Sequence, residues 1–215
     1  MIVGAHGILE AQYVGLRIVI IEDDDLEFRS IARVVREHGA LVTRATTLAE
    51  AHATVGDPSD FDAVLVDIKL PDGSGIDIVK ILVARHAAAV ALIVMSGFPA
   101  SELANDLGLE YQVPFLAKPF GLPHLFEALD EELVLARLLA IPGLVGGAAM
   151  AEKMALRRML RTLRETGGNK TKTAARLGVA RTTLRDKMKL YDLRSASFAK
   201  AHRREARTSR FHAPR

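Results

Sequence analysis

Short apolar runs alternate with amphipathic stretches over the first 140 residues of the chain. Runs such as Ala63–Val66 lack the alternation of apolar and polar positions that marks a strand with one wet face. They predict strands that helices cover on both sides. Pro114 lies within the last run, which fits an edge strand because proline cannot donate to a central ladder. The pattern predicts an α/β fold with a doubly wound, five-stranded parallel sheet, its strands near residues 18–21, 40–45, 63–66, 91–95 and 113–117.

The pattern changes beyond residue 140. The segment IPGLVGGAAM, residues 141–150, is rich in glycine and predicts a linker. Three helical stretches follow at 151–166, 170–177 and 181–190, and tight turns separate them, which is typical of a small all-α DNA-binding unit. The basic tail, residues 195–215, is weakly periodic, and we expect it to be disordered.

Charge divides the chain at the same place. Residues 1–140 hold 10 Lys and Arg against 21 Asp and Glu, whereas residues 141–215 hold 19 against 5. This asymmetry favours binding of a polyanion by the C-terminal part, although charge alone leaves open a merely solvated basic tail.

Composition narrows the classes of function. The chain contains no cysteine, which excludes disulfides, thiolate zinc sites and cysteine nucleophiles. The N-terminus has no basic segment before its apolar residues, and no run reaches the roughly 18 apolar residues that a membrane-spanning helix needs. We expect a cytoplasmic protein without a membrane partner.

Polar residues follow the predicted strands at their carboxyl ends. Glu22 and Asp23 follow the first strand, Asp67 the third, Ser96 the fourth and Lys118 the fifth. Because the carboxyl ends of parallel strands meet in one crevice, we expect these side chains to lie together. Asp24 and Asp25, by contrast, fit acids in the first turn of a helix.

This set suits phosphoryl transfer. Carboxylates held close together repel one another, and Mg²⁺ bound by their oxygens would offset that cost. Asp67 could then attack phosphorus, while Ser96 and Lys118 contact the equatorial oxygens of the phosphoryl group.

These residues resemble the receiver domain of two-component response regulators over about residues 16–140. IVIIEDDD resembles the first strand with its acidic pair, VLVDIKLPDGSGID the acceptor segment, IVMSGF the serine or threonine position, and FLAKPF the lysine with its following proline. The resemblance implies a flavodoxin-like strand order of 2-1-3-4-5 and phosphorylation of Asp67 by a sensor histidine kinase. It also implies Mg²⁺ at Glu22, Asp23, Asp67 and the backbone carbonyl of Lys69.

Three further features follow from the same resemblance. Ser96 and Phe115 would form the switch that reports phosphorylation, although an aromatic residue in an edge strand is also often plain packing. Lys118–Pro119 would be a cis peptide. The segment from Gly97 to Gln112 departs from the family, with a short fourth helix between Pro99 and Gly108.

Residues 167–193, GGNKTKTAARLGVARTTLRDKMKLYDL, resemble a Fis-type helix-turn-helix within a predicted DNA-binding domain at 151–194. Ala174, Leu177 and Leu184 are spaced to pack two short helices, with Gly178 at the left-handed position that ends the first. The resemblance implies double-stranded promoter DNA as partner, and a homodimer paired through the first helix that reads two half-sites. The expected DNA-contacting residues are Lys170, Thr171, Arg181, Thr182, Thr183, Arg185, Lys187 and Lys189.

The segment TGGNKT is not a phosphate-binding loop, because Asn169 stands where glycine must precede the lysine. With no ATPase, the architecture is similar to the two-domain regulators of the ActR/RegA/PrrA group, and we predict a phosphorylated, DNA-binding transcriptional regulator that is not an enzyme. Two alternatives stay open. One is a phosphatase-like hydrolase with an aspartyl nucleophile. Such an enzyme would need a second acidic residue two positions after Asp67, and the residue there is Lys69. The other is a constitutive DNA-binding protein with a degenerate receiver.

Overall fold

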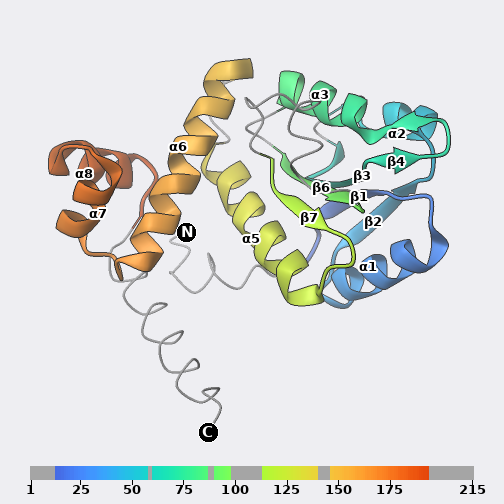
Figure 1. The fold of residues 1–215 in the computed structure, drawn as a ribbon, viewed down its shortest axis with the longest axis horizontal. Coiled ribbons are helices and arrows are strands. Elements are labelled where there is room, and N and C mark those ends of the chain that lie inside the picture. Colours follow the sequence, from blue (N-terminus) through green and yellow to red (C-terminus); the bar gives the residue numbers. More distant parts are fainter. Residues whose placement is uncertain (1–12, 58–59, 87–89, 98–112, 140–145, 194–215) are drawn as a thin grey trace, which may run out of the picture. The chain divides into compact units, whose positions relative to one another are not determined.

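The structure is a computed structural model that describes residues 13–57, 60–86, 90–97, 113–139 and 146–193 (Figure 1). The chain divides into two units, one of residues 9–153 and the other formed mainly by residues 154 onward. Each unit is described by itself below.

The first unit is built on a parallel sheet. Among the described residues, five strands form this sheet in the order β2-β1-β3-β6-β7. The predicted fold class and strand order are therefore confirmed, and β7, which follows Pro114, is an edge strand. The strands are β1 Arg17–Ile21, β2 Leu41–Ala45, β3 Ala63–Asp67, β6 Ala91–Ser96 and β7 Phe115–Ala117.

A second, antiparallel pair of strands was not predicted. β4, Lys69–Leu70, pairs with β5, Gly73–Ser74, directly after Asp67. Strands of two residues are too short to show any periodicity of apolar positions, so the sequence pattern carries no signal for them.

Helices cover both faces of the parallel sheet (Figure 1). α1 and α5 lie on one face, while α2 and α3 lie on the other. The predicted short fourth helix between Gly97 and Gln112 lies outside the described residues except for Gly97. The helices are α1 Asp25–Glu37, α2 Leu48–Thr54, α3 Gly75–His86 and α5 Leu122–Leu138.

The start of α1 follows directly from the acidic run after β1. Asp24 is the N-cap, and its side chain accepts hydrogen bonds from the backbone N–H groups of Leu26 and Glu27, both at 2.8 Å. Asp25 lies in the first turn, where negative charge is favourable. Asp24 therefore has a structural role that separates it from Glu22 and Asp23.

Two apolar layers hold the unit together. The sheet strands contribute fully buried Ile, Val, Leu and Ala side chains, and the inner faces of α1 and α5 pack against them through residues such as Val35 and Leu129. Burial of this kind stabilises by about 25 cal/mol per Å² of apolar surface. The five strand ends at the carboxyl edge are thus held on a rigid frame.

Tyr13 extends the packed unit beyond the predicted start at residue 16. Its ring is 1% exposed and lies against the rings of His38 and Phe126, at centroid distances of 5.8 and 6.0 Å. The Tyr13 hydroxyl donates to the carboxylate of Asp130 at 2.9 Å. The segment before β1 therefore ties the end of α1 to α5.

Helix α6, Gly146–Glu165, begins within the segment predicted as a linker. Residues 146–150 are helical, so α6 begins five residues before the predicted helix start at residue 151. The reason is visible at Lys153, whose buried ammonium lies 2.9 Å from the Glu132 carboxylate and donates to the carbonyl oxygen of Val90 at 3.0 Å. Ala149 is also fully buried, and these contacts stabilise a helical start that glycine disfavours.

The second unit contains the later part of α6 together with α7, Lys170–Leu177, and α8, Arg181–Leu190. The Asn169 side chain caps α7 by accepting from the backbone N–H of Lys172 at 3.0 Å. Gly178 ends α7 in the left-handed conformation, with φ of 70°, as predicted. Ala174 and Leu184 are buried between the two helices, while Leu177 is half-buried.

Gly75 offers a test of the frame around Asp67. A Cβ at Gly75 would lie 2.0 Å from the backbone oxygen of Asp67 and 2.9 Å from a methyl group of Val66. Gly75→Ala should therefore lower the free energy of unfolding by about 1–3 kcal/mol, because α3 must shift away from β3. Urea denaturation followed by circular dichroism measures the change.

The matched control is Gly56→Ala, where the nearest atoms to an added Cβ are 3.8 Å away. This exposed position should change stability by no more than about 1 kcal/mol. Equal stability of the two variants would contradict the close approach at Gly75.

Candidate functional site

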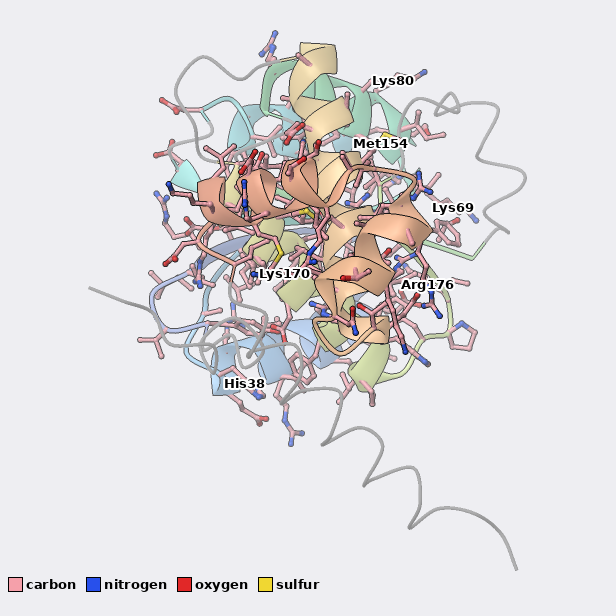
Figure 2. The ribbon with its side chains drawn as sticks, turned by 90° about the vertical axis from the view of Figure 1, so that its left-hand side faces the viewer. His38, Lys69, Lys80, Met154, Lys170 and Arg176 are labelled. Atoms are coloured by element: carbon pink, nitrogen blue, oxygen red, sulfur yellow. The ribbon has the colours of Figure 1, made fainter. Side chains whose placement is uncertain are left out.

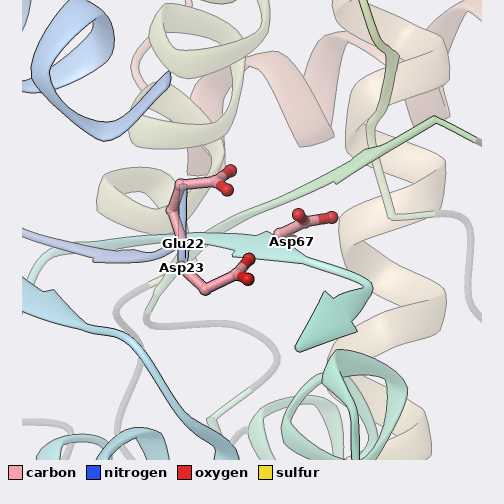
Figure 3. Close-up of side chains that lie close together, drawn as sticks. All are labelled: Glu22, Asp23 and Asp67. Atoms are coloured by element: carbon pink, nitrogen blue, oxygen red, sulfur yellow. The ribbon is translucent and has the colours of Figure 1, made fainter. Parts of the chain in front are cut away.

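Three carboxylates converge at the carboxyl edge of the sheet. Glu22 and Asp23 follow β1, and Asp67 ends β3, the strand that pairs with β1. Within the described part of the chain, each offers an oxygen within 4.8 Å of the others (Figure 3). Glu22 is 1% exposed and Asp67 is 6% exposed, whereas Asp23 is open to solvent.

Lys118, which follows β7, lies against this acidic cluster. Its ammonium nitrogen is 2.7 Å from Glu22 Oε2, 2.8 Å from Asp67 Oδ2 and 2.5 Å from Glu27 Oε2. Burial lowers the pKa of Lys118, but its hydrogen bonds to Asp67, Glu22 and Glu27 outweigh that effect and the pKa rises above its usual value. Lys118 is therefore a permanent cation at the site.

Opposing effects act on the charge of the buried Glu22 carboxyl group. Burial raises its pKa to about 7, although the hydrogen bond and charge of Lys118 oppose this. The neighbouring charge of Asp67 raises the pKa further, and the backbone N–H of Asp24 lowers it by donating to Glu22 at 3.2 Å. One lysine does not fully offset the cost of placing two buried carboxylates side by side.

The cluster fits a hard divalent cation. Its donors are carboxylate oxygens alone, two from nearly buried side chains and one from an exposed side chain that leaves room for water. Mg²⁺ prefers oxygen ligands and usually retains several waters. Glu22, Asp23 and Asp67 could therefore hold Mg²⁺, whose charge would reduce the repulsion among them.

The other predicted site residues take different places. The Lys69 backbone N–H donates to Asp67 Oδ1 at 3.2 Å, so Lys69 lies directly beside the acceptor carboxylate. Ser96 is 1% exposed at the end of β6, one residue beyond Met95, which pairs with Asp67. Phe115 is half-buried in β7 opposite Val94, two residues before the strand ends at Ala117. The Lys118–Pro119 peptide is cis.

Two residues of this region were missed by sequence reasoning. Glu27, in the first turn of α1, contacts Lys118, and Arg44, in β2, contacts the segment that carries Glu22 and Asp23. Neither follows the carboxyl end of a strand, the position at which the sequence pattern predicts site residues. An acid and a base in these elements also match the ordinary pattern of solvated surface charges.

The second unit presents a basic face. Arg181, Thr182, Thr183, Arg185 and Lys189 of α8 are exposed, as is Thr171 of α7, while Lys187 and Lys170 are half-buried. Figure 2 shows the stick view of the side chains, with Lys170 and Arg176 labelled on α7. The predicted DNA-contacting residues thus lie on two consecutive helices and are at least partly open to solvent.

The chain matches two known protein families. Residues 18–130 match the family described as response regulator receiver domain. The chain belongs to this family. Residues 150–191 match the family described as bacterial regulatory protein, Fis family. A receiver followed by a Fis-type helix-turn-helix is the domain composition of a DNA-binding, two-component response regulator.

Named relatives agree with this composition. The transcriptional regulatory protein FixJ of Azorhizobium caulinodans is 35% identical over 105 residues, which are 49% of each chain, so the match spans about half of that relative. The photosynthetic apparatus regulatory protein RegA of Rhodovulum sulfidophilum is 28% identical over 171 residues, or 78% of this chain and 87% of RegA. A match of this length reaches into both the receiver domain and the Fis-type domain.

A crystal structure of a signal receiver domain from Vibrio parahaemolyticus has a TM-score of 0.51 and 21% identity, and the match covers 58% of this chain and 95% of that one. It supports the receiver fold alone. None of the described helices is long and apolar enough to cross a membrane.

The pKa of Glu22 predicts how the stability of the receiver depends on pH. The folded protein holds the Glu22 proton more tightly than the unfolded chain does. Glu22 therefore makes its full contribution to the free energy of unfolding below about pH 4.5, and this contribution is lost as the pH rises towards about 7. A glutamine side chain at position 22 cannot lose a proton. Glu22→Gln should therefore reduce the change in the free energy of unfolding with pH by about 1–3 kcal/mol. Urea denaturation at about pH 5 and pH 7.5 measures the difference.

Other shifted carboxyls should not obscure the result. Hydrogen bonds lower the pKa of Asp25, Glu50 and Asp72, so these groups titrate below the chosen window. Asp77→Asn, at an exposed position of α3, is the control and should keep the pH dependence of the unaltered protein. The same slope in Glu22→Gln and the unaltered protein would refute the assignment.

Proposed function

We propose that a sensor histidine kinase phosphorylates Asp67 in a Mg²⁺-dependent reaction, and that this modification controls promoter binding by α7 and α8. The observation that carries the proposal is the position of Asp67. It ends a buried strand, lies beside two further carboxylates and is 2.8 Å from the Lys118 ammonium. This combines a nucleophilic oxygen, an acidic cation site and a fixed positive charge.

In the proposed reaction, a carboxylate oxygen of Asp67 bonds to phosphorus as the P–N bond to the kinase histidine breaks. The bonding pair returns to the imidazole nitrogen, and the product is an aspartyl phosphate. Bound Mg²⁺ would supply positive charge to the oxygens of the transferred group. Lys118 would turn from Glu22 and Glu27 towards the phosphoryl group, and the Ser96 hydroxyl would donate to one of its oxygens.

The same residues favour a stoichiometric acceptor over a phosphatase-like hydrolase. A hydrolase that turns over needs a group to activate water against the aspartyl phosphate. Lys69, two residues after Asp67, has a positively charged ammonium group that cannot accept a proton from water, and its backbone N–H donates to Asp67. We therefore propose that the protein is a regulator and not an enzyme.

For the second unit we propose binding to double-stranded DNA through the exposed face of α8. Arg181 and Arg185 can donate to base edges in the major groove, and Lys189 can neutralise phosphate. The N-terminus of α7, near Lys170 and Thr171, is suited to a backbone phosphate. The match to the Fis family supports this arrangement.

Homodimerisation through α6 remains a proposal that rests on the Fis-family match. The apolar side chains of Leu156, Met159, Leu160 and Leu163 on α6 are already buried within the single chain. A dimer would therefore use other residues of α6 or require these side chains to repack.

Asp67→Ala tests the acceptor assignment. The full-length protein, incubated with Mg²⁺ and radiolabelled acetyl phosphate, should acquire base-labile phosphate that Asp67→Ala abolishes. Asp77→Ala, an exposed aspartate of α3, should be labelled normally. Labelling that persists in Asp67→Ala would overturn the assignment, and sustained hydrolysis of the donor would favour the hydrolase.

Arg185→Ala tests the DNA-binding face. Loss of a bidentate contact to a base should weaken binding to a specific promoter fragment by about 1–3 kcal/mol, as measured by fluorescence anisotropy. Arg33→Ala, at an exposed position of α1 in the receiver, removes the same charge and should leave affinity unchanged. Equal DNA affinities of the two variants would exclude Arg185 from the interface. If phosphorylation of the unaltered protein leaves its DNA affinity unchanged, the result would favour a constitutive DNA-binding protein with a degenerate receiver.

A further inference from the structure

We propose that Arg44 is a positioning residue for the metal site, holding the backbone of Glu22 and Asp23 in the orientation that Mg²⁺ binding requires. The inference rests on the proposed Mg²⁺-dependent function and adds a residue from a different element. Arg44 lies on β2, opposite Ile20 of β1, and is not itself a ligand. It would act only through the segment that joins β1 to α1.

Arg44 contacts this segment through every nitrogen of its guanidinium group. Its Nε donates to the backbone oxygen of Glu22 at 3.1 Å, and its Nη2 donates to the backbone oxygen of Asp23 at 2.9 Å. Its Nη1 lies 2.5 Å from a carboxylate oxygen of Asp25. All three nitrogens of the guanidinium group thus bind residues between positions 22 and 25, and two of these residues, Glu22 and Asp23, are candidate metal ligands.

The guanidinium group is also held from its face. It lies over the ring of Phe28, with the central carbon 4.4 Å from the ring centroid, and the Arg44 side chain is only 22% exposed. Next to it, the backbone N–H of Glu22 donates to the oxygen of Ala45 at 3.0 Å. The end of β2 therefore holds the backbone of Glu22 at both its N–H and its carbonyl group.

These bonds matter because a side chain can reach a metal only from a suitably oriented backbone. The carbonyls of Glu22 and Asp23 face Arg44, so each rotation of these peptide units breaks a charge-assisted hydrogen bond. Lysine at position 44 would keep the charge but lose the planar fork that reaches several acceptors at once. Groups that orient metal ligands in this way typically contribute 10- to 100-fold to metal affinity.

The charge of Arg44 alone would have the opposite effect. A cation beside the acidic cluster repels Mg²⁺, so its removal should strengthen metal binding if electrostatics were its only influence. Positioning and electrostatics therefore predict changes of opposite sign for Arg44→Met. This difference in sign separates a positioning role from a simple change of charge.

The experiment measures metal affinity directly on the unphosphorylated, full-length protein. Mn²⁺ binding is followed by the electron paramagnetic resonance signal of the free ion, and Mg²⁺ is then added as a competitor. Arg44→Lys and Arg44→Met should both raise the Mg²⁺ dissociation constant, on the order of 10-fold. Arg33→Lys, at an exposed arginine of α1, is the control and should leave the constant unchanged.

A second readout uses the rate of phosphorylation by acetyl phosphate. The Arg44 variants should need more Mg²⁺ for half-maximal rate, yet approach the rate of the unaltered protein when Mg²⁺ is saturating. Unchanged affinity in folded Arg44→Lys, or tighter binding in Arg44→Met, would overturn the inference. If both Arg44 variants fail to fold, Phe28→Leu replaces them and should weaken Mg²⁺ binding about 2- to 5-fold; unchanged affinity there overturns the inference as well.

The outcomes distinguish this inference from the proposed function. If the unaltered protein binds neither Mn²⁺ nor Mg²⁺, or if Glu22→Gln binds them normally, the metal site itself is wrong and the role of Arg44 falls with it. If the unaltered protein binds Mg²⁺ and Glu22→Gln weakens binding, normal affinity in the Arg44 variants refutes the positioning role alone.

Discussion

The balance of charge around Lys118 is the interaction on which the receiver site depends. Glu22 and Asp67 are almost completely removed from water, and each would be very costly as an isolated anion. The ammonium of Lys118 lies within 2.8 Å of both, although Lys118 follows β7, which two strands, β3 and β6, separate from β1 in the sheet. Lys118 only partly offsets the two negative charges. The site can therefore accept a further cation, and it can accept a phosphoryl group that would draw Lys118 away from the carboxylates.

The positions of these charged groups depend on the fold. The candidate metal ligands lie at the carboxyl ends of β1 and β3, Lys118 follows β7, and a parallel sheet with this strand order brings these ends to one edge. The apolar side chains of the three central strands, β1, β3 and β6, supply the rigidity, since they are buried between α1 and α5 on one face and α2 and α3 on the other. The positions of the charged groups therefore follow from the positions of uncharged ones.

Much of this arrangement could be predicted from the sequence. Uninterrupted apolar runs mark buried parallel strands, and the residue that follows each run is placed at one edge by topology alone. Glu22, Asp67 and Lys118 were found in this way, and Gly178 was found because a left-handed helix end strongly favours glycine. These are signals that a single residue and its neighbours carry.

The features that escaped prediction depend on contacts between distant residues. Glu27 and Arg44 occupy ordinary charged positions, and their importance comes from the atoms that the fold brings to them. The same holds for Lys153, because its buried partner Glu132 belongs to another helix and no local pattern pairs them. The early start of α6 also reflects such packing, which overrode the low helix propensity of its glycines.

Tyr13 sets a practical boundary for dissecting the protein. A receiver expressed from residue 16, where the family resemblance begins, would lack this side chain and would leave a cavity between the rings of His38 and Phe126. Removing a buried aromatic side chain typically costs about 3–5 kcal/mol, a large part of the stability of a domain of this size. The carboxylate of Asp130 would also lose its hydroxyl donor. An isolated receiver should therefore begin upstream of Tyr13, since a shorter fragment could misfold for reasons unrelated to phosphorylation.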